Sequence, residues 1–215
     1  MERDRHHLSA VIFDYGNVLS DVQATSDIDS MAGVLNLDRA QFQEAYWQFR
    51  VAYDEAELTP ESYWHSVADY ASQTIDDAKL AELRRMDIRS WIRPNPPMVR
   101  WAGRLREAGI KTAVLSNMPS DLFEYLRGPE SWLPQFDQLT FSCETHCSKP
   151  AAEIYRHCLD GLGVAPEKAL FLDDREPNIE GALKLGMRGL LFSSVAAAIA
   201  ELKGRYVLPE LVESQ

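Results

Sequence analysis

The sequence AVIFDYGNVL, at residues 10–19, combines a short apolar run with a polar segment that follows it. Four apolar residues, Ala10–Phe13, are followed at once by Asp14 and then by Tyr15, Gly16 and Asn17, a combination suited to a tight loop. An unbroken apolar strand is typical of a parallel sheet that is covered on both faces. We therefore expect Asp14 at the carboxyl end of a buried strand, which is the edge where such sheets bind ligands.

Further apolar runs repeat this pattern along the chain, and helical stretches separate them. The helical stretches begin near prolines and end at glycines, as helix ends commonly do. This alternation predicts an α/β fold, a Rossmann-like doubly wound parallel sheet. The other expected strands are Thr112–Leu115, Leu139–Phe141, Ala169–Leu172 and Gly189–Phe192, and the expected helices are Pro94–Ala108, Pro150–Leu162 and Pro177–Leu185.

Residues 22–92 interrupt the alternation of strands and helices. This segment is far longer than the single helix that one crossover between parallel strands requires. Their aromatic residues fall at helical spacing on one face, and Thr59 followed by Pro60 predicts the start of another helix. We therefore expect an inserted small α-helical module at residues 22–92. Residues 1–21 and 93–215 are expected to form the α/β domain. The aromatic residues concerned are Phe42, Tyr46, Phe49 and Tyr53.

The composition narrows the classes of partner. The chain has 215 residues, with 33 acidic against 22 basic side chains and a formal net charge of −11. Such a charge argues against binding to nucleic acid or to an anionic membrane, whereas a small phosphorylated metabolite is still compatible with a local basic site. No apolar run resembles a signal peptide or a membrane span, so we expect a cytoplasmic protein. The oligomeric state, monomer or homodimer, is left open.

Polar residues follow several of the apolar runs. Ser116-Asn117 comes after the second run, Lys149 opens a later helical stretch, and Asp173-Asp174 follows Leu-Phe-Leu. Taken singly, each has an ordinary explanation as a loop or helix cap. Two adjacent carboxylates at a strand end are costly, however, unless a cation or hydrogen-bond donors neutralise them. Hard oxygen ligands of this kind suit Mg²⁺.

The ordered set of these residues resembles the haloacid dehalogenase-like (HAD) superfamily of hydrolases. Residues 13–19 (FDYGNVL) resemble its first motif and residues 115–117 (LSN) its second. Lys149-Pro150 resembles the third, and FLDD at 171–174 with Asn178 resembles the fourth. The match runs from residue 10 to about 193, and the helical module resembles the superfamily's cap domain. The FDxGNV loop is most similar to that of the small sugar-phosphate phosphatases, including glucose-1-phosphatases.

The resemblance implies a Mg²⁺-dependent phosphatase, a phosphoric monoester hydrolase. Asp14 would attack phosphorus and form an aspartyl-phosphate, which water then hydrolyses. The Mg²⁺ ion would be held by Asp14, by the backbone carbonyl of Gly16 and by Asp174, with Asp173 acting indirectly or through water.

The same resemblance assigns the groups that bind the phosphoryl oxygens. These groups are the Ser116 hydroxyl, the Asn117 backbone N–H and the Lys149 ammonium. Lys149 would also neutralise Asp14. Substrate selection is expected in the helical module, and Tyr15 and Tyr53 are the main candidates for contact with the substrate. Further candidates are Asp21, Tyr46 and Glu57, although the aromatic residues are equally suited to packing.

One position departs from the superfamily's pattern. Most of its phosphatases carry a second Asp two residues after the nucleophile as general acid and base, and here that position is Gly16. Loss of such a group costs about 10²–10⁴-fold in rate when the leaving group is poor. Two alternatives therefore stay open. One is a 2-haloacid dehalogenase-type hydrolase, which needs no metal, and the other is a catalytically weak binding or regulatory protein, which Asn178 also favours.

Overall fold

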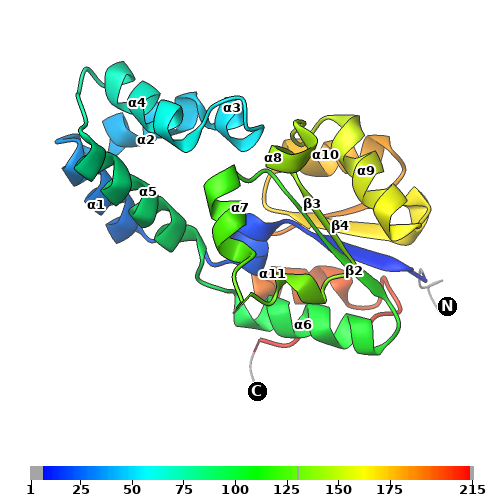
Figure 1. Ribbon diagram of the computed structural model, residues 1–215. Helices are drawn as coiled ribbons and strands as arrows, with labels where there is room; N and C mark the ends of the chain where they lie inside the picture. The colour runs from blue at the N-terminus through cyan, green and yellow to red at the C-terminus, as the bar shows by residue number, and fades with distance from the viewer. Residues whose placement is uncertain (1–6, 130, 214–215) are drawn as a thin grey trace.

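The computed structural model describes residues 7–129 and 131–213 and contains a five-stranded parallel sheet (Figure 1). The strands lie in the order β3-β2-β1-β4-β5, so the first strand of the chain is the central one. The predicted α/β class with a parallel sheet is confirmed. The strands are β1 (Ala10–Phe13), β2 (Lys111–Ser116), β3 (Gln138–Phe141), β4 (Ala169–Asp173) and β5 (Arg188–Leu191).

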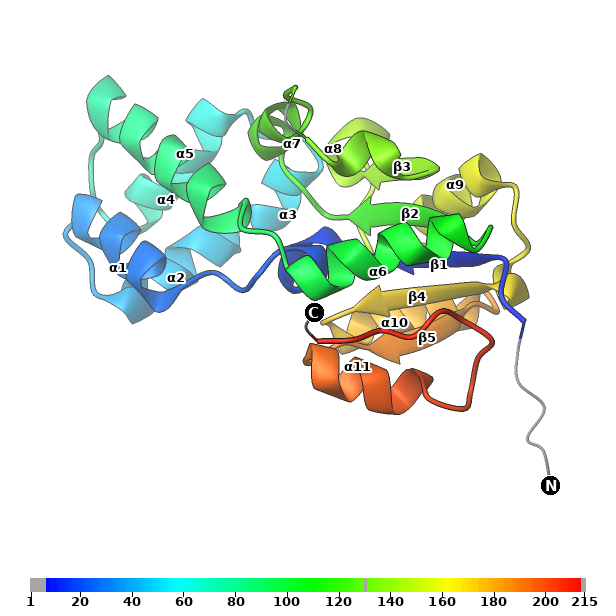
Figure 2. The same ribbon diagram turned by 90° about the horizontal axis from the view of Figure 1, so that it is seen from below.

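Helices cover both faces of the sheet, which explains why the central strand is apolar at every position (Figures 1 and 2). Val11 and Phe13 belong to the apolar cluster shared with α6 and α11, whereas Ala10 and Ile12 belong to the cluster shared with α9 and α10. Successive strand residues point to opposite faces, so β1 supplies both cores. The helices are α6 (Pro96–Glu107), α7 (Ser120–Leu126), α8 (Ser142–Thr145), α9 (Ala152–Leu162), α10 (Glu176–Lys184) and α11 (Val195–Leu202).

Three of these helices fall where the prolines and glycines predict them. α6, α9 and α10 begin or end within two residues of the predicted bounds, because prolines sit near their first turns and a glycine follows each within two residues of its end. Short single turns complete the chain between the longer elements: a π-type turn η1 (Tyr15–Leu19) and the 3₁₀ turns η2 (Leu133–Gln135) and η3 (Pro166–Lys168).

Residues 22–92 fold into a bundle of short helices beside the sheet's carboxyl edge (Figures 1 and 2). The bundle has its own apolar cluster, in which the rings of Tyr53 and Tyr63 stack with their centroids 4.0 Å apart. The predicted start at Thr59 is confirmed, because its hydroxyl accepts the backbone N–H of Ser62. The helices are α1 (Thr25–Val34), α2 (Arg39–Gln48), α3 (Arg50–Asp54), α4 (Pro60–Tyr70) and α5 (Asp77–Trp91).

The two connections between the bundle and the sheet domain run side by side. The backbone N–H of Asp21 donates to the carbonyl of Arg93 over 2.8 Å, and Ser20 and Pro94 form an isolated antiparallel bridge. The aromatic stripe predicted as one helical face is divided at Phe49, where α2 ends and α3 begins. That residues 22–92 act as a cap over residues 1–21 and 93–215 stays a prediction.

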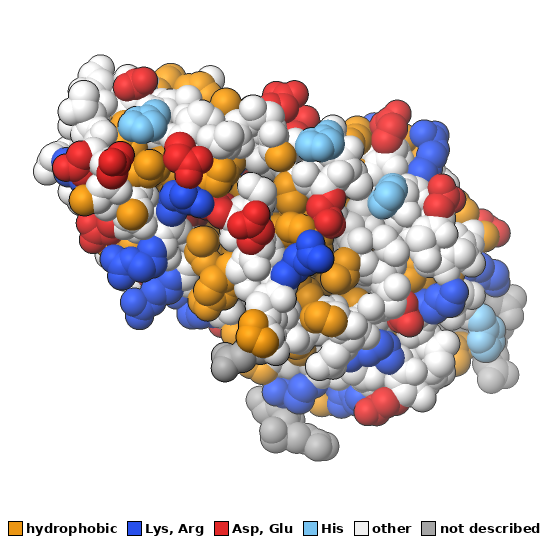
Figure 3. Space-filling view, in the orientation of Figure 1, with side chains coloured by type: hydrophobic (Ala, Val, Ile, Leu, Met, Phe, Trp, Pro, Cys, Tyr) orange, Lys and Arg blue, Asp and Glu red, His pale blue; other side chains and the backbone are white. Residues whose placement is uncertain are grey.

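The surface mixes both signs of charge. Acidic and basic side chains are spread together over the face in Figure 3, so the net charge of −11 does not form one continuous acidic area there. Within the part of the chain that the structure describes, no helix is both long and apolar enough to cross a membrane.

Candidate active site

A cavity of about 640 Å³ lies where the carboxyl ends of the strands face the helical bundle. Because β1, β2 and β4 are parallel neighbours, the polar residues that follow them converge on this one edge. From the sheet domain the cavity is lined by Asp14, Ser116, Asn117, Lys149 and Asp174, and from the bundle by Gln23, Trp47, Arg50, Asp54 and Trp91, among others.

Asp14 ends β1 and is only 7% exposed. Its Oδ1 accepts the backbone N–H of Tyr15 over 2.7 Å and lies 2.9 Å from Lys149 Nζ. The loop that follows turns sharply at Asn17, whose φ of +59° places the backbone in the left-handed region. This turn lets Asn17 Nδ2 donate to Asp174 Oδ2 over 2.8 Å, so the loops after β1 and β4 are joined directly.

Asp173 serves to hold Lys149. Its buried carboxylate accepts Lys149 Nζ over 2.6 Å, the Arg175 backbone N–H over 2.8 Å, and Asn178 Nδ2 at 3.0 Å from each oxygen. Both oxygens of Asp173 therefore have donors already. The ammonium of Lys149 is fixed between Asp173 and Asp14, which gives it one position at the edge of the cavity.

Burial dominates the electrostatics of this group. It raises the pKa of Asp14 to about 7; the Lys149 ammonium opposes that rise, and the carboxylates of Asp173 and Asp174 add to it. Burial alone would lower the pKa of Lys149, but the carboxylates of Asp14 and Asp173 outweigh it and the pKa is raised. Lys149 is consequently an ammonium at neutral pH, and the site carries more negative than positive charge.

The acidic residues fit a divalent cation. Carboxylate oxygens of Asp14, Asp173 and Asp174 lie within 4.8 Å of one another. Within the described ranges, Asp14 Oδ2 and Asp174 Oδ1 accept no hydrogen bond, whereas both oxygens of Asp173 do. The donor chemistry thus suits Mg²⁺, and Asp14 and Asp174 are the carboxylates that could ligate it.

The second strand end contributes hydrogen-bonding groups that also fix the lysine. Ser116 is 3% exposed, and its hydroxyl donates weakly to the Asn117 carbonyl over 3.4 Å. The Asn117 side chain pairs with the backbone of Lys149, donating to its carbonyl over 3.1 Å and accepting its N–H over 2.8 Å. From the sequence, only the backbone N–H of Asn117 was expected to take part in the site, as a donor to the phosphoryl oxygens. The pairing of its side chain with the Lys149 backbone could not be recognised without the fold.

Of the expected substrate contacts, Tyr15 lines the cavity and donates from its hydroxyl to the Trp91 carbonyl over 3.1 Å. Tyr53 does not line it, because its ring packs inside the bundle and its hydroxyl donates to Asp121 over 2.6 Å. Tyr46 is likewise buried in the bundle, and Asp21 and Glu57 are exposed away from the cavity lining.

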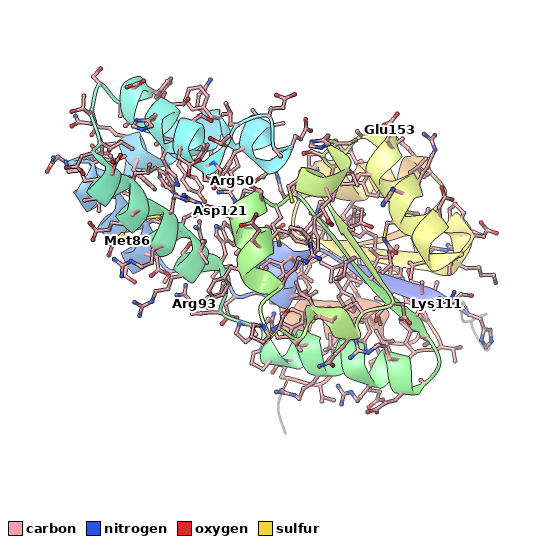
Figure 4. The ribbon with its side chains drawn as sticks, viewed as in Figure 1. Arg50, Met86, Arg93, Lys111, Asp121 and Glu153 are labelled. Atoms are coloured by element: carbon pink, nitrogen blue, oxygen red, sulfur yellow. The ribbon has the colours of Figure 1, made fainter. Side chains whose placement is uncertain are left out.

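Sequence reasoning missed the charged pair that the bundle places at the cavity. Arg50 and Asp54 stand one helical turn apart on α3, and Arg50 Nε lies 2.9 Å from Asp54 Oδ1. Both side chains are buried, and Arg50 faces the boundary with the sheet domain, where α7 carries Asp121 (Figure 4). The spacing i, i+4 was visible in the sequence, but charged pairs at that spacing usually lie on solvated helix faces.

The sequence matches the haloacid dehalogenase-like hydrolase family over residues 8–186. It is 33% identical over 118 residues to acyl-CoA dehydrogenase family member 10 of Mus musculus, covering 53% of this chain and 11% of that protein. It is 34% identical to bifunctional epoxide hydrolase 2 of Rattus norvegicus over 51% of this chain and 20% of that protein. The chain therefore spans only a small part of these two relatives.

A relative of similar length is the sesquiterpene phosphatase astK of Aspergillus oryzae. It is 24% identical over 194 residues, which cover 90% of this chain and 94% of that protein. The similarity therefore runs through the helical bundle as well as the sheet domain.

Solved structures share the fold. A HAD family enzyme from Bacteroides thetaiotaomicron, in complex with magnesium and inorganic phosphate, has a TM-score of 0.68 at 18% identity, covering 85% of this chain and 93% of that one. An L-2-haloacid dehalogenase from Xanthobacter autotrophicus has a TM-score of 0.65 at 22% identity, covering 85% and 76% of the two chains.

Proposed function

The chain belongs to the haloacid dehalogenase-like hydrolase family, and from that membership we propose that it is a Mg²⁺-dependent phosphatase acting on a small phosphorylated metabolite. The observation that carries the proposal is the group formed by Asp14, Lys149 and Asp174, with Lys149 Nζ 2.9 Å from Asp14. A carboxylate nucleophile beside a fixed ammonium and a further free carboxylate suits the transfer of a doubly charged phosphoryl group.

In the proposed reaction Asp14 attacks phosphorus and the leaving-group oxygen departs. Water then hydrolyses the aspartyl-phosphate and restores Asp14. Lys149, Ser116 and the backbone N–H of Asn117 bind the phosphoryl oxygens and offset the charge that develops on them. A Mg²⁺ ion held by Asp14, the Gly16 carbonyl and Asp174, with Asp173 acting indirectly, would supply further positive charge at the phosphoryl group.

For the substrate we propose a sugar phosphate. The FDYGNV loop is similar to that of glucose-1-phosphatases, and the cavity offers aromatic walls at Tyr15, Trp47 and Trp91 beside the polar pair Arg50 and Asp54. A sugar presents both an apolar ring face and hydroxyl groups, so such a lining is suited to it. Residues 22–92 are proposed to act as the cap that covers the substrate and limits access of water.

A dehalogenase is the second candidate. It is favoured by the missing carboxylate at Gly16 and by the structural likeness to L-2-haloacid dehalogenase. Against it stands the acidic group of Asp14, Asp173 and Asp174, for which a reaction without a metal has little use. The relative astK, which is named a phosphatase and matches nearly the whole chain, also supports the first candidate.

The test is release of inorganic phosphate from a panel of sugar phosphates and from p-nitrophenyl phosphate, with Mg²⁺ and with EDTA. Turnover is expected with Mg²⁺ only, and Asp14→Asn is expected to abolish it. The matched control is Asp69→Asn, which changes an exposed aspartate on α4 outside the cavity and should keep full activity. Chloride release from 2-chloropropionate in EDTA, without phosphate release from any ester, would instead establish the dehalogenase.

A further inference from the structure

A phosphatase of this kind needs a proton donor for its leaving group, and position 16 cannot supply one. Gly16 has no side chain, and a Cβ built on its backbone would lie 3.3 Å from Cζ3 of Trp91. Any side chain at this position would therefore press against the indole. If the reaction uses a proton donor from the chain, that donor must stand elsewhere around the cavity.

Asp54 is the candidate that the cavity offers. Among the described residues that line it, Asp54 is the one carboxylate outside the group of Asp14 and Asp174. It comes from the opposite wall, at the end of α3, and is only 7% exposed. A carboxylate that lines the same cavity as the nucleophile but comes from the helical bundle is suited to protonating a leaving group.

The backbone of Asp54 is linked by hydrogen bonds to the segment at the end of β2 that begins with Ser116 and Asn117, the proposed phosphate-binding residues. Its carbonyl accepts the hydroxyl of Ser142 over 2.5 Å, and the same Ser142 oxygen accepts the backbone N–H of Met118 over 2.9 Å. Met118 directly follows Asn117, so one serine side chain joins the end of α3 to this segment. Two hydrogen bonds through Ser142 thus hold the backbone of Asp54 against the segment that follows Ser116 and Asn117.

The surroundings of Asp54 leave it able to gain and lose a proton. Oδ1 accepts Nε of Arg50 over 2.9 Å, whereas within the described ranges Oδ2 accepts no hydrogen bond. Burial raises the pKa of Asp54 to about 6; Arg50 and the more distant Lys149 lower it, and Asp87 on α5 raises it. Tyr63 on α4 and Cys143 on α8 are further titratable groups near it, and burial raises the pKa of each; His146, after α8, contacts the carbonyl of the adjacent Glu55.

We propose that Asp54 is the general acid and base of the reaction, in place of the carboxylate absent at position 16. In the first step an Asp14 oxygen bonds to phosphorus, the ester P–O bond breaks, and the Asp54 proton passes to the departing oxygen. In the second step Asp54 accepts a proton from the water that attacks the aspartyl-phosphate. That step releases inorganic phosphate and returns both residues to their starting forms. This inference depends on the phosphatase function proposed above.

The experiment compares two aryl esters of similar size in Mg²⁺-loaded protein. p-Nitrophenolate leaves without a proton, whereas phenolate is a poor leaving group, so only phenyl phosphate needs the acid. Asp54→Asn is expected to lower kcat/KM for phenyl phosphate about 10²-fold and to leave kcat/KM for p-nitrophenyl phosphate unchanged. Because the ratio of the two values is independent of the fraction of folded protein, partial misfolding of the variant cannot imitate this result.

Two further readouts follow from the same role. Asp54→Asn also lacks the base for the second step. With p-nitrophenyl phosphate it should therefore release a burst of one p-nitrophenol per active site and then accumulate phosphoenzyme. In wild type, the ratio of kcat/KM for phenyl phosphate to kcat/KM for p-nitrophenyl phosphate should fall as the pH rises above about 6, because only phenyl phosphate needs protonated Asp54, whereas ionisation of Asp14 affects both esters alike. Asp54→Glu should restore part of the phenyl phosphate activity.

The control is Asp69→Asn, which alters an exposed aspartate on α4 of the same bundle that does not line the cavity. It should keep the wild-type ratio of the two kcat/KM values. An unchanged ratio in Asp54→Asn, with no burst, would overturn the assignment of Asp54 while leaving the phosphatase in place. Wild-type protein that hydrolyses no phosphate ester would overturn both proposals together.

Discussion

Asp173 and Asp174 are adjacent in the sequence, yet their side chains meet different partners. Asp173 is fully buried and accepts hydrogen bonds from Lys149, Asn178 and the backbone, whereas Asp174 lines the cavity and accepts only from Asn17 among the described residues. Successive residues at a strand end point to opposite sides, so one carboxylate can hold the lysine while its neighbour is left for a cation. The two should therefore respond differently to the same substitution.

Asp173→Asn is expected to reduce the free energy of unfolding by about 3–5 kcal/mol, because it leaves the buried Lys149 ammonium without its closer partner. The amide of Asn178 would also lose acceptors at that position. Asp174→Asn, at a partly exposed site, is expected to change the same quantity by less than about 1 kcal/mol. Urea unfolding in EDTA measures both, and equal losses in the two variants would contradict this division.

Mg²⁺ should stabilise the folded wild-type protein, because the ion binds carboxylates that converge only in the native state. At a concentration of about 100 times Kd the gain is about 2.7 kcal/mol. The stabilisation should disappear in Asp174→Asn, whose free carboxylate oxygen is replaced. Thermal unfolding followed across a Mg²⁺ titration measures this independently of catalysis, and a variant that gains as much as wild type would argue against Asp174 as a ligand.

At the scale of secondary-structure elements, the strands of the sheet domain were predictable from the sequence, whereas the bundle residues that line the cavity were not. The unbroken apolar runs predicted each strand of the sheet to within one residue, and the polar residues after β1, β2 and β4 converge as the parallel topology requires. Arg50 and Asp54 escaped prediction because their position depends on how α3 docks against α8, and no local pattern encodes that contact. Tyr53 was expected to contact substrate, but its hydroxyl donates a hydrogen bond to Asp121 instead.

The packing of α10 against the segment that follows Lys149 leaves no room for a side chain at Gly181. A Cβ there would lie 2.9 Å from the Pro150 carbonyl oxygen and 3.0 Å from the Tyr155 hydroxyl. Gly181→Ala is therefore expected to cost about 1–3 kcal/mol despite the better helix propensity of alanine, and to lower kcat by displacing Lys149. The control is Gly33→Ala in α1, where nothing lies within 4 Å and up to about 1 kcal/mol should be gained. Chemical unfolding of both variants tests the contrast.

At the scale of the whole molecule, the bundle and the sheet domain are built as separable units that share one cavity. Each has its own apolar cluster, and the two connecting segments are already hydrogen-bonded to each other at Asp21 and Arg93. Yet Ala56, Ile88 and Trp91 of the bundle also pack on the sheet domain's core. The bundle thus has an apolar cluster of its own and also lines the cavity that contains Asp14.

Removing the bundle should consequently retain the attack of Asp14 on phosphorus and abolish protonation of the leaving group by Asp54. A chain in which a two-glycine linker joins Asp21 to Arg93 is expected to fold, because the sheet and both its cores are retained, with lower stability from the lost contacts of Trp91. With Mg²⁺ it should still release p-nitrophenol from p-nitrophenyl phosphate, in the same burst as Asp54→Asn, since Asp14 and Lys149 remain, but it should lose phenyl phosphate turnover together with Asp54. Circular dichroism and the ratio of the two kcat/KM values test this. Retention of the wild-type ratio would mean that the proton donor lies in the sheet domain.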